Sequence, residues 1–231
     1  MANNKPGKNH DLLKQRILYV AAKDFLERGY TNTTMKDIAK KSQLSIGSVT
    51  NLYGSKEDIL CGLVELVIER QFEVTGQLLK GTTDDRILLY ATETVLQLHI
   101  AEMNENLREL YRNAYSFSKT SELLQQKITG KLGDIFGEYL PELEAKDFYK
   151  LEIASGGIMR GFMVVPCSIW FTMEEKVEAF LETALLIYRV PEEKIREAVD
   201  FVKGLDFDSV ANETIGGIVR YLEEKQKEVL P

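Results

Sequence analysis

The spacing of apolar residues along the chain predicts helices almost from end to end. Leucine, isoleucine, alanine and phenylalanine residues recur every three or four positions, which places them on one face of an α-helix. Strict alternation of apolar and polar residues, the pattern of a half-buried strand, is not found, so the sequence predicts an all-α fold. The expected helices cover residues 11–28, 35–41, 46–52, 55–79, 85–103, 105–118, 121–140, 146–165, 172–188, 191–203 and 208–228.

Residues 34–60 predict two short helices joined by a turn and followed by the start of a third helix. Thr34 with Asp37, and Ser55 with Asp58, have the spacing of capping boxes, which mark helix N-termini. Two helices of about two turns each, joined by about three residues, have helix-turn-helix spacing, in which the second helix enters the DNA major groove.

The side chains of this segment suit DNA binding. Asparagine pairs with adenine through two hydrogen bonds, serine and threonine meet any base edge, and an isoleucine methyl group contacts the thymine methyl. Lysine side chains and helix N-termini bind phosphates. The spacing alone leaves a purely structural three-helix unit as an equal alternative. The expected DNA contacts are Thr34, Lys36, Ser45, Ile46, Ser48, Thr50, Asn51, Tyr53 and Lys56.

Residues 16–60 resemble the N-terminal DNA-binding domain of the TetR family of bacterial transcription regulators. The most specific parts of the resemblance are the runs Ser45-x-Gly47-Ser48-Val49 and Tyr53-Gly54-Ser55-Lys56-Glu57. The chain departs from the family at Gln43, where glycine is usual, and at Thr50, where tyrosine is usual. A non-glycine residue at positive φ costs on the order of 1 kcal/mol, so the turn is expected to be strained or differently shaped.

The resemblance implies a homodimeric regulator that binds a palindromic double-stranded operator. In this family the C-terminal helical domain binds a small effector and pairs two subunits. We therefore expect a DNA-binding domain over residues 1–55 and an effector-binding and dimerisation domain over residues 56–231. Repression with release by the effector is the expected mode, although the sequence does not exclude activation.

The net charge of −7 is unevenly distributed along the chain. Residues 1–60 carry ten lysine and arginine residues against six aspartate and glutamate residues, which gives +4, and the remainder of the chain carries −11. A basic end on an acidic body docks on DNA in one orientation, because the phosphates repel the body. Residues 1–10 are expected to be a mobile tail, with Lys5 and Lys8 reaching DNA as the alternative.

The helices expected at 85–118 and 146–170 are rich in methionine and aromatic residues, which suits an adaptable apolar effector pocket. Ordinary core packing explains each of these residues equally well. Two arginines in the same segments are candidates for anchoring an anionic group of an apolar or amphipathic effector. The expected ligand contacts are Met103, Tyr111, Arg112, Tyr115, Phe117, Met159, Arg160, Met163 and Trp170.

Glycine pairs in two C-terminal helices predict close helix approach at the subunit interface. Gly157 and Gly161 lie on one face of a helix, and Gly216 and Gly217 lie in the last helix. The long helix expected at 55–79 is the single continuous element that we expect to touch both domains. It is therefore the expected lever between effector and DNA.

Other functional classes find little support in the sequence. There is no nucleophile elbow, phosphate-binding loop or metal-ligand spacing, so we expect no enzyme activity, no cofactor and no metal site. No apolar run approaches the roughly 20 residues of a membrane span, and no signal peptide pattern is present, so a cytoplasmic protein is expected. The alternatives are a helical protein-interaction module and an enzyme in which the helix-turn-helix is only structural.

Overall fold

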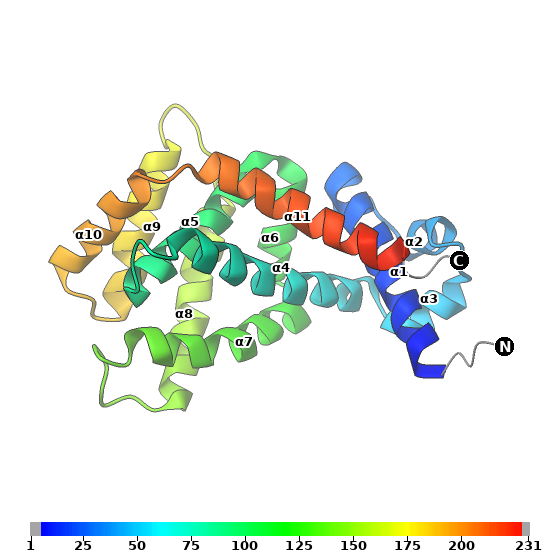
Figure 1. Cartoon of the computed structure of the whole chain (residues 1–231), viewed down its shortest axis with the longest axis horizontal. Helices are drawn as coiled ribbons and strands as arrows, with labels where there is room; N and C mark the ends of the chain where they lie inside the picture. The colour runs from blue at the N-terminus through cyan, green and yellow to red at the C-terminus, as the bar shows by residue number, and fades with distance from the viewer. Residues whose placement is uncertain (1–5, 228–231) are drawn as a thin grey trace.

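A computed structural model of the chain describes residues 6–227, which form eleven helices and no β-strand beyond an isolated bridge between Ser168 and Phe171 (Figure 1). The predicted all-α class is therefore confirmed. The helices are α1 Pro6–Arg28, α2 Met35–Lys41, α3 Ile46–Tyr53, α4 Lys56–Leu79, α5 Arg86–Met103, α6 Glu105–Ala114, α7 Ser118–Phe136, α8 Ala145–Met163, α9 Met173–Ile187, α10 Glu192–Lys203 and α11 Phe207–Lys227.

Three helix ends differ by four or more residues from the sequence prediction, and one of them is the end of α7 at Phe136, where the sequence predicts residue 140. Helix α1 begins at Pro6, so the second half of the expected tail is helical, while Lys5 and the side chain of Lys8 lie outside the described residues. Helix α6 ends at Ala114, four residues early, because the Asn113 carbonyl accepts the N–H groups of two following residues and starts a turn into α7.

Helices α1, α2 and α3 and the start of α4 form the N-terminal head, the part of the chain that the sequence predicts to bind DNA. Ile17 and Phe25 of α1, Ile38 of α2, Val49 of α3 and Ile59 of α4 are fully buried against one another. The predicted capping box of α2 is present, with Thr34 and Asp37 bonded reciprocally. Burial of these apolar faces, together with the caps, fixes the angle between α2 and α3.

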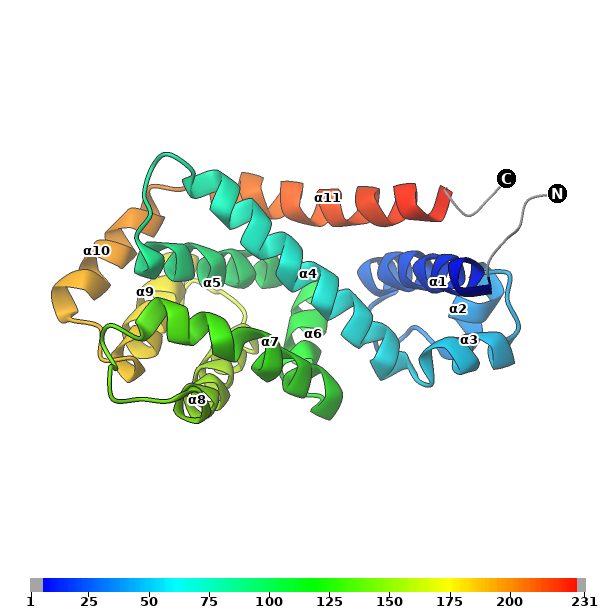
Figure 2. The same ribbon diagram turned by 60° about the horizontal axis from the view of Figure 1, so that its bottom comes forward.

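The rest of α4 and the helices from α5 to α11 form the body. Helix α5 lies at its centre and is surrounded by α4 and the helices from α6 to α11 (Figure 2). It is buried on nearly every side, and its buried residues include Glu93 and Gln97. No helix among the described residues is long and apolar enough to span a membrane.

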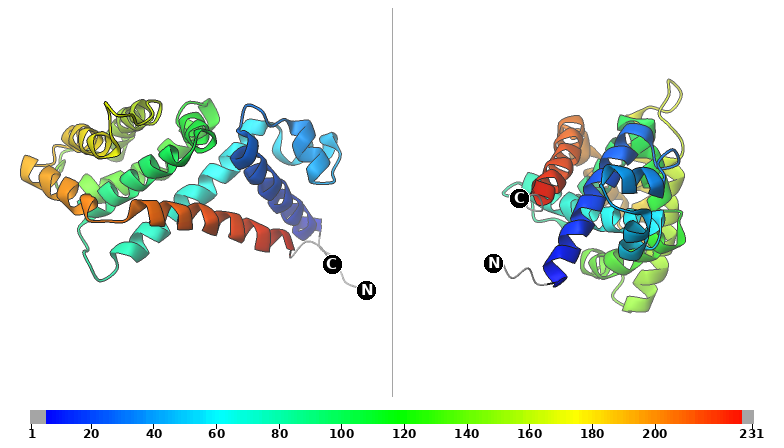
Figure 3. Two further views of the ribbon diagram at one scale, coloured as in Figure 1. Left: turned by 90° about the horizontal axis from the view of Figure 1, so that it is seen from above. Right: turned by 90° about the vertical axis from the view of Figure 1, so that its right-hand side faces the viewer.

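Several elements, and not α4 alone, join the head to the body. Helix α4 runs from the head deep into the body (Figure 3), but α11 also packs along α1, and α6 contacts the end of α1. The Glu109 carboxylate accepts the Tyr30 N–H at 2.7 Å and the Thr31 N–H at 3.2 Å, and the Asn106 amide donates to the Leu26 carbonyl at 2.8 Å. The expectation that α4 is the single connection is therefore wrong.

Candidate nucleic-acid interface and ligand cavities

The turn between α2 and α3 has the left-handed conformation that the sequence made questionable. Gln43 has φ of 55°, and Leu44 donates its N–H to the Ala39 carbonyl at 3.0 Å. Leu44 packs against the head core, which explains why the backbone accepts this strained conformation. The turn therefore keeps helix-turn-helix geometry without the usual glycine.

Helix α3 presents its predicted base-reading side chains to solvent. Ser45 caps the helix by accepting the Ser48 N–H at 3.0 Å. Ile46 is 54% exposed, and Thr50 and Asn51 are also exposed, while Val49 fills the core behind them. Ser48 is exposed as well, with its hydroxyl 2.8 Å from that of Ser45. The structure thus brings these predicted residues together on one free face.

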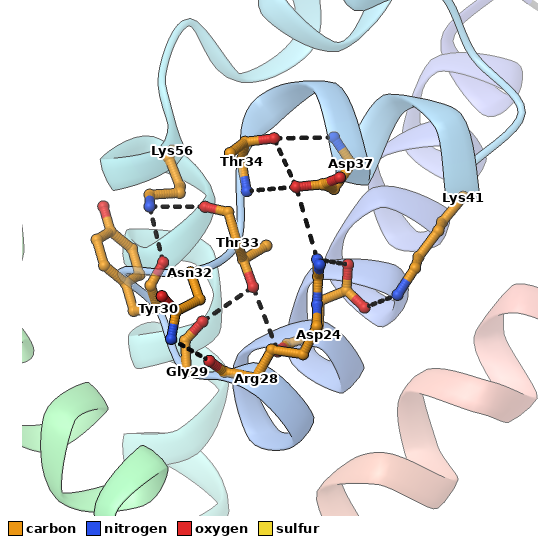
Figure 4. Close-up of polar contacts among 10 residues, drawn as sticks. All are labelled: Asp24, Arg28, Gly29, Tyr30, Asn32, Thr33, Thr34, Asp37, Lys41 and Lys56. Atoms are coloured by element: carbon orange, nitrogen blue, oxygen red, sulfur yellow. Dashed lines mark hydrogen bonds and ion pairs between the residues drawn. The ribbon is translucent and has the colours of Figure 1, made fainter.

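An ion-pair network holds α2 against α1 at the edge of this face (Figure 4). The buried Asp24 carboxylate pairs with Arg28 at 2.9 Å and with Lys41. The Thr34 hydroxyl is used within the capping box of α2, where it also donates to Asp37 at 2.6 Å. Hydrogen bonding from Thr34 and the nearby Arg28 hold the pKa of Asp37 below its ordinary value.

Lys56, predicted to bind a phosphate, points into the head instead (Figure 4). Its ammonium group donates to the carbonyl oxygens of Tyr30 and Thr33, both at 2.7 Å, and lies 4.0 Å from the centre of the Tyr30 ring. Desolvation lowers the pKa of Lys56. The ammonium group is therefore hydrogen-bonded within the protein, and Lys56 is not placed to contact a phosphate.

Tyr53 and Lys36, two further predicted phosphate contacts, have different environments. The Tyr53 ring is half-buried, its hydroxyl donates to the Lys14 carbonyl at 3.4 Å, and burial raises its pKa above the ordinary value. Lys36 is exposed on α2. Lys36 is therefore better placed than Tyr53 or Lys56 to meet a phosphate.

An apolar cavity of about 90 Å³ lies where the head meets the body. Side chains of α1, α4, α6 and α11 form most of its wall, including Phe25 of the head. Among the predicted ligand residues, Tyr111 and Tyr115 line it. The Tyr111 hydroxyl accepts a hydrogen bond from Gln71 at 2.6 Å, and burial raises the pKa of Tyr111.

A second cavity of about 40 Å³ lies beside the first, inside the body. Met159 and Tyr115 from the predicted set line it, together with Glu93 and Glu152, which the sequence analysis missed. Glu93 is 4% exposed and Glu152 is 5% exposed. Desolvation raises the pKa of Glu93 to about 7 and that of Glu152 to about 8.

A sequence signal for Glu152 was available. The buried stripe of α8 contains Phe148, Glu152, Ser155, Met159 and Met163, at intervals of three or four residues. A glutamate at an inward position of such a stripe is unusual, because a buried carboxyl group is rarely left without a purpose or a partner.

The remaining predicted ligand residues line neither cavity. Met163 is buried in the core of the body. Phe117 packs against Tyr30, with the centres of the two rings 5.4 Å apart. Met103 and Arg160 are exposed, Arg112 is half-buried, and Trp170 is 86% exposed in the loop between α8 and α9. No arginine lines either cavity, so the expected anchor for an anionic group is not found there.

The four predicted interface glycines have different environments. The space beside Gly157 and Gly161 is open, so neither lets another helix of the same chain approach closely. A Cβ atom on Gly217 would lie 3.6 Å from the Arg70 guanidinium of α4, and Gly216 is covered by Arg220 of its own helix. The α8 pair is therefore the better candidate for contact with a partner subunit.

A solved structure, that of RolR, has the same fold. The chain is similar to RolR in complex with resorcinol, with a TM-score of 0.67 and 15% identity over 84% of this chain and 95% of RolR. It is also similar to a gamma-butyrolactone receptor, an ArpA-like protein, with a TM-score of 0.42 and 14% identity over 90% of this chain and 99% of the receptor. No curated protein sequence matches the chain.

A protein-family model matches the head of the chain. Residues 17–61 match the model of the bacterial regulatory proteins of the tetR family. This range agrees within one residue at each end with the resemblance predicted for residues 16–60. It includes the turn between α2 and α3 and the exposed face of α3. The head of this chain is therefore similar, over residues 17–61, to the bacterial regulatory proteins of the tetR family.

Proposed function

We propose that the protein is a homodimeric transcriptional repressor that binds a palindromic operator and leaves it when a small effector binds the body. The observation that carries the DNA-binding part is the free face of α3, where Ile46, Ser48, Thr50 and Asn51 are exposed together on a helix held by a helix-turn-helix. These residue types match the hydrogen-bonding and methyl groups of base edges.

Charge supports one docking orientation. The basic residues of the first 60 positions give the head a net charge of +4, while the body carries −11. Exposed Lys36 lies on α2, beside the base-reading helix, and contacts the DNA backbone in this proposal. The acidic body is repelled by phosphates, which favours approach by the head.

The DNA-binding proposal is tested by selecting duplexes that bind the purified protein and measuring affinity against salt. Asn51→Ala is expected to cost about 1–3 kcal/mol and to relax the preference at one base position, because a bidentate base contact is lost. Lys36→Ala is expected to weaken all sequences alike and to reduce the salt slope by about 1 per half-site.

Lys80→Ala is the matched control, since Lys80 is exposed at the end of α4 remote from the head. It should change neither the affinity nor the salt slope. If Asn51→Ala and Lys36→Ala lower DNA affinity equally for all sequences, Asn51 contacts the DNA backbone and does not read a base. Failure to bind any duplex at low salt would exclude DNA binding.

An exposed apolar stripe on α8 supports the dimer. Tyr149 and Ile153 of this helix and its C-cap residue Val164 are exposed, and the open glycines Gly157 and Gly161 lie between them. A stripe of this kind on two copies forms a self-complementary interface about a two-fold axis, with the glycines allowing close approach. The two α3 helices then sit about 34–36 Å apart, one turn of DNA.

Effector release follows from the position of the apolar cavity. Its wall includes Phe25 of α1 together with side chains of α4, α6 and α11, so a ligand there touches every element that joins head to body. A ligand that binds free and DNA-bound forms equally shifts nothing. To empty the operator it must prefer the free form by roughly 10²–10⁴-fold, or about 3–5.5 kcal/mol.

A further inference from the structure

Two side chains line both the apolar cavity and the second cavity, which we call the apolar chamber and the acidic chamber. Gln97 of α5 and Tyr115, which follows α6, line both cavities. The Tyr115 hydroxyl donates to the Gln97 side-chain oxygen at 2.8 Å, and the Gln97 amide donates to the Glu93 carboxyl at 2.8 Å. Tyr115 and Gln97 therefore lie between the apolar residues of one chamber and Glu93 of the other.

The acidic chamber is built around two carboxyl groups with few donors. Glu93 accepts a hydrogen bond from Gln97, and Glu152 accepts one from the Ser155 hydroxyl at 3.1 Å. The one basic side chain of the wall is Lys131, which is exposed and lies with its ammonium group 4.1 Å from the centre of the Phe72 ring. Buried carboxyl groups with so little compensation disfavour an anionic ligand and favour a cationic one.

Aromatic rings surround the carboxyl groups. Phe72, Tyr90, Tyr115 and Phe180 all line the acidic chamber. The faces of aromatic rings attract cations by about 0.5–2 kcal/mol each. Carboxyl groups within aromatic walls are the combination that recognises organic ammonium groups.

The apolar chamber suits the remainder of such a ligand. Its wall is almost entirely aliphatic and aromatic, with Gln71 and Gln97 among the few polar side chains. Burial of hydrocarbon there contributes about 25 cal/mol per Å² of apolar surface. A ligand that fills both chambers needs a charged amine at one end and an apolar group at the other.

We propose that the effector of this protein is an amphipathic organic amine, whose ammonium group lies between Glu93 and Glu152 and whose apolar group occupies the chamber beside α1. This inference rests on the proposed function and specifies the chemical class of its effector. It replaces the expectation that Arg112 or Arg160 binds an anionic group of the effector. A ligand that fills both chambers contacts Tyr115 and Gln97, which line both.

The test compares three probes of one skeleton: phenylbutylamine, phenylbutanol and phenylbutyrate. Their binding to the purified protein without DNA is measured by titration calorimetry. The amine is expected to bind about tenfold or more tightly than the alcohol, and the carboxylate is expected not to bind. This comparison on the unmodified protein decides the charge preference without any variant.

Variants locate the two ends of the probe. At about pH 9, above the folded pKa values of both groups, Glu93→Gln and Glu152→Gln are each expected to lower amine affinity about tenfold and to leave alcohol affinity unchanged, because each removes one negative charge. Ala114→Leu fills the apolar chamber and is expected to weaken amine and alcohol alike. Glu122→Gln, on the exposed side of α7, is the matched control and should change neither affinity.

Equal binding of amine and alcohol, preference for the carboxylate, or no binding of any probe at millimolar concentration would overturn the proposal. Amine affinity that is insensitive to both Gln variants would overturn it as well. Operator affinity with and without the amine is measured separately. Selective amine binding that leaves operator affinity unchanged supports this site and rejects effector release, so the two proposals fail independently.

Discussion

At the scale of single residues, Lys56 shows how a charged side chain near DNA serves the fold instead. Its ammonium group supplies hydrogen bonds to the Tyr30 and Thr33 carbonyls, which lie in the segment between α1 and α2 and are not used in any helix. The Tyr30 ring covers the same ammonium group. Lys56 therefore ties the start of α4 to the entrance of the helix-turn-helix.

Lys56→Met is expected to destabilise the protein by about 1–3 kcal/mol, since two buried carbonyl groups lose a charged donor. Urea unfolding measures this loss. The salt slope of DNA binding should not change, in contrast to the exposed control Lys36→Met, which lowers the slope and leaves stability unchanged. A reduced slope with intact stability would show that Lys56 contacts a phosphate.

The buried carboxyl groups of Glu93 and Glu152 make stability depend on pH. Both pKa values rise on folding, from an ordinary 4.5 to about 7 and about 8. Between pH 4.5 and these values the folded chain binds more protons than the unfolded chain, so stability falls as pH rises. The loss amounts to a few kcal/mol in total and is complete above the folded pKa values.

The measurement is urea unfolding from pH 5 to pH 8 on the parent protein and on the Glu93→Gln/Glu152→Gln double variant. The variant should lose the downward slope and be the more stable of the two at pH 8. Desolvation lowers the pKa of His99, which adds stability as pH rises through its ordinary value of 6.5. That contribution is common to both proteins and cancels in the difference. Parallel pH profiles would contradict the assignment.

At the scale of elements, the turn of the helix-turn-helix stores strain at one position. Gln43 has φ of 55°, a conformation that L-residues other than glycine adopt at a cost. Gln43→Gly is expected to stabilise the protein by about 0.5–1 kcal/mol, because relief of strain exceeds the added flexibility of the unfolded chain. Gln43→Ala, which keeps the strain, is the control and should give no gain in thermal stability. Destabilisation by glycine would mean that the Gln43 side chain itself is needed.

Helices α5 and α8 show where periodicity is informative and where it is not. The inward stripe of α8 is readable from its spacing, including the unusual Glu152. Helix α5 is buried on nearly all sides, so apolar spacing does not separate Glu93 from the residues around it. Neither helix alone indicates that the two glutamates share one cavity.

At the scale of the whole molecule, the exposed face of α8 determines assembly in our proposal. Gly161→Leu should weaken the dimer by about 1–3 kcal/mol, because a leucine side chain prevents close approach of two copies. Within one chain the space is open, so the substitution should raise helix stability by up to about 1 kcal/mol. Sedimentation and thermal unfolding measure the two effects separately.

Gly130→Leu in α7 is the matched control, since Gly130 also faces open space. It should raise helix stability in the same way and leave the dimer unchanged. If Gly161→Leu behaves like the control, α8 is not the interface. A monomer for the unmodified protein at micromolar concentration would reject the dimer itself.

Coupling between effector and DNA also belongs to this scale. The apolar cavity touches α1, α4, α6 and α11 at once, and Glu109 of α6 holds the backbone of the segment after α1. A lever made of α4 alone is therefore too simple. We therefore propose that α4 moves together with α6 and α11, which also contact α1.

The sequence by itself determined the helices, the caps at Thr34 and Ser55, and the side chains expected on the exposed face of α3. These features depend on periodicity and on hydrogen bonds between residues three or four positions apart, which one segment contains entirely. Only the tertiary structure decided that Lys56 faces Tyr30, and that Glu93 and Glu152 share a cavity. Those positions are set by how distant helices pack, and side-chain burial and charge compensation arise only after that packing is complete.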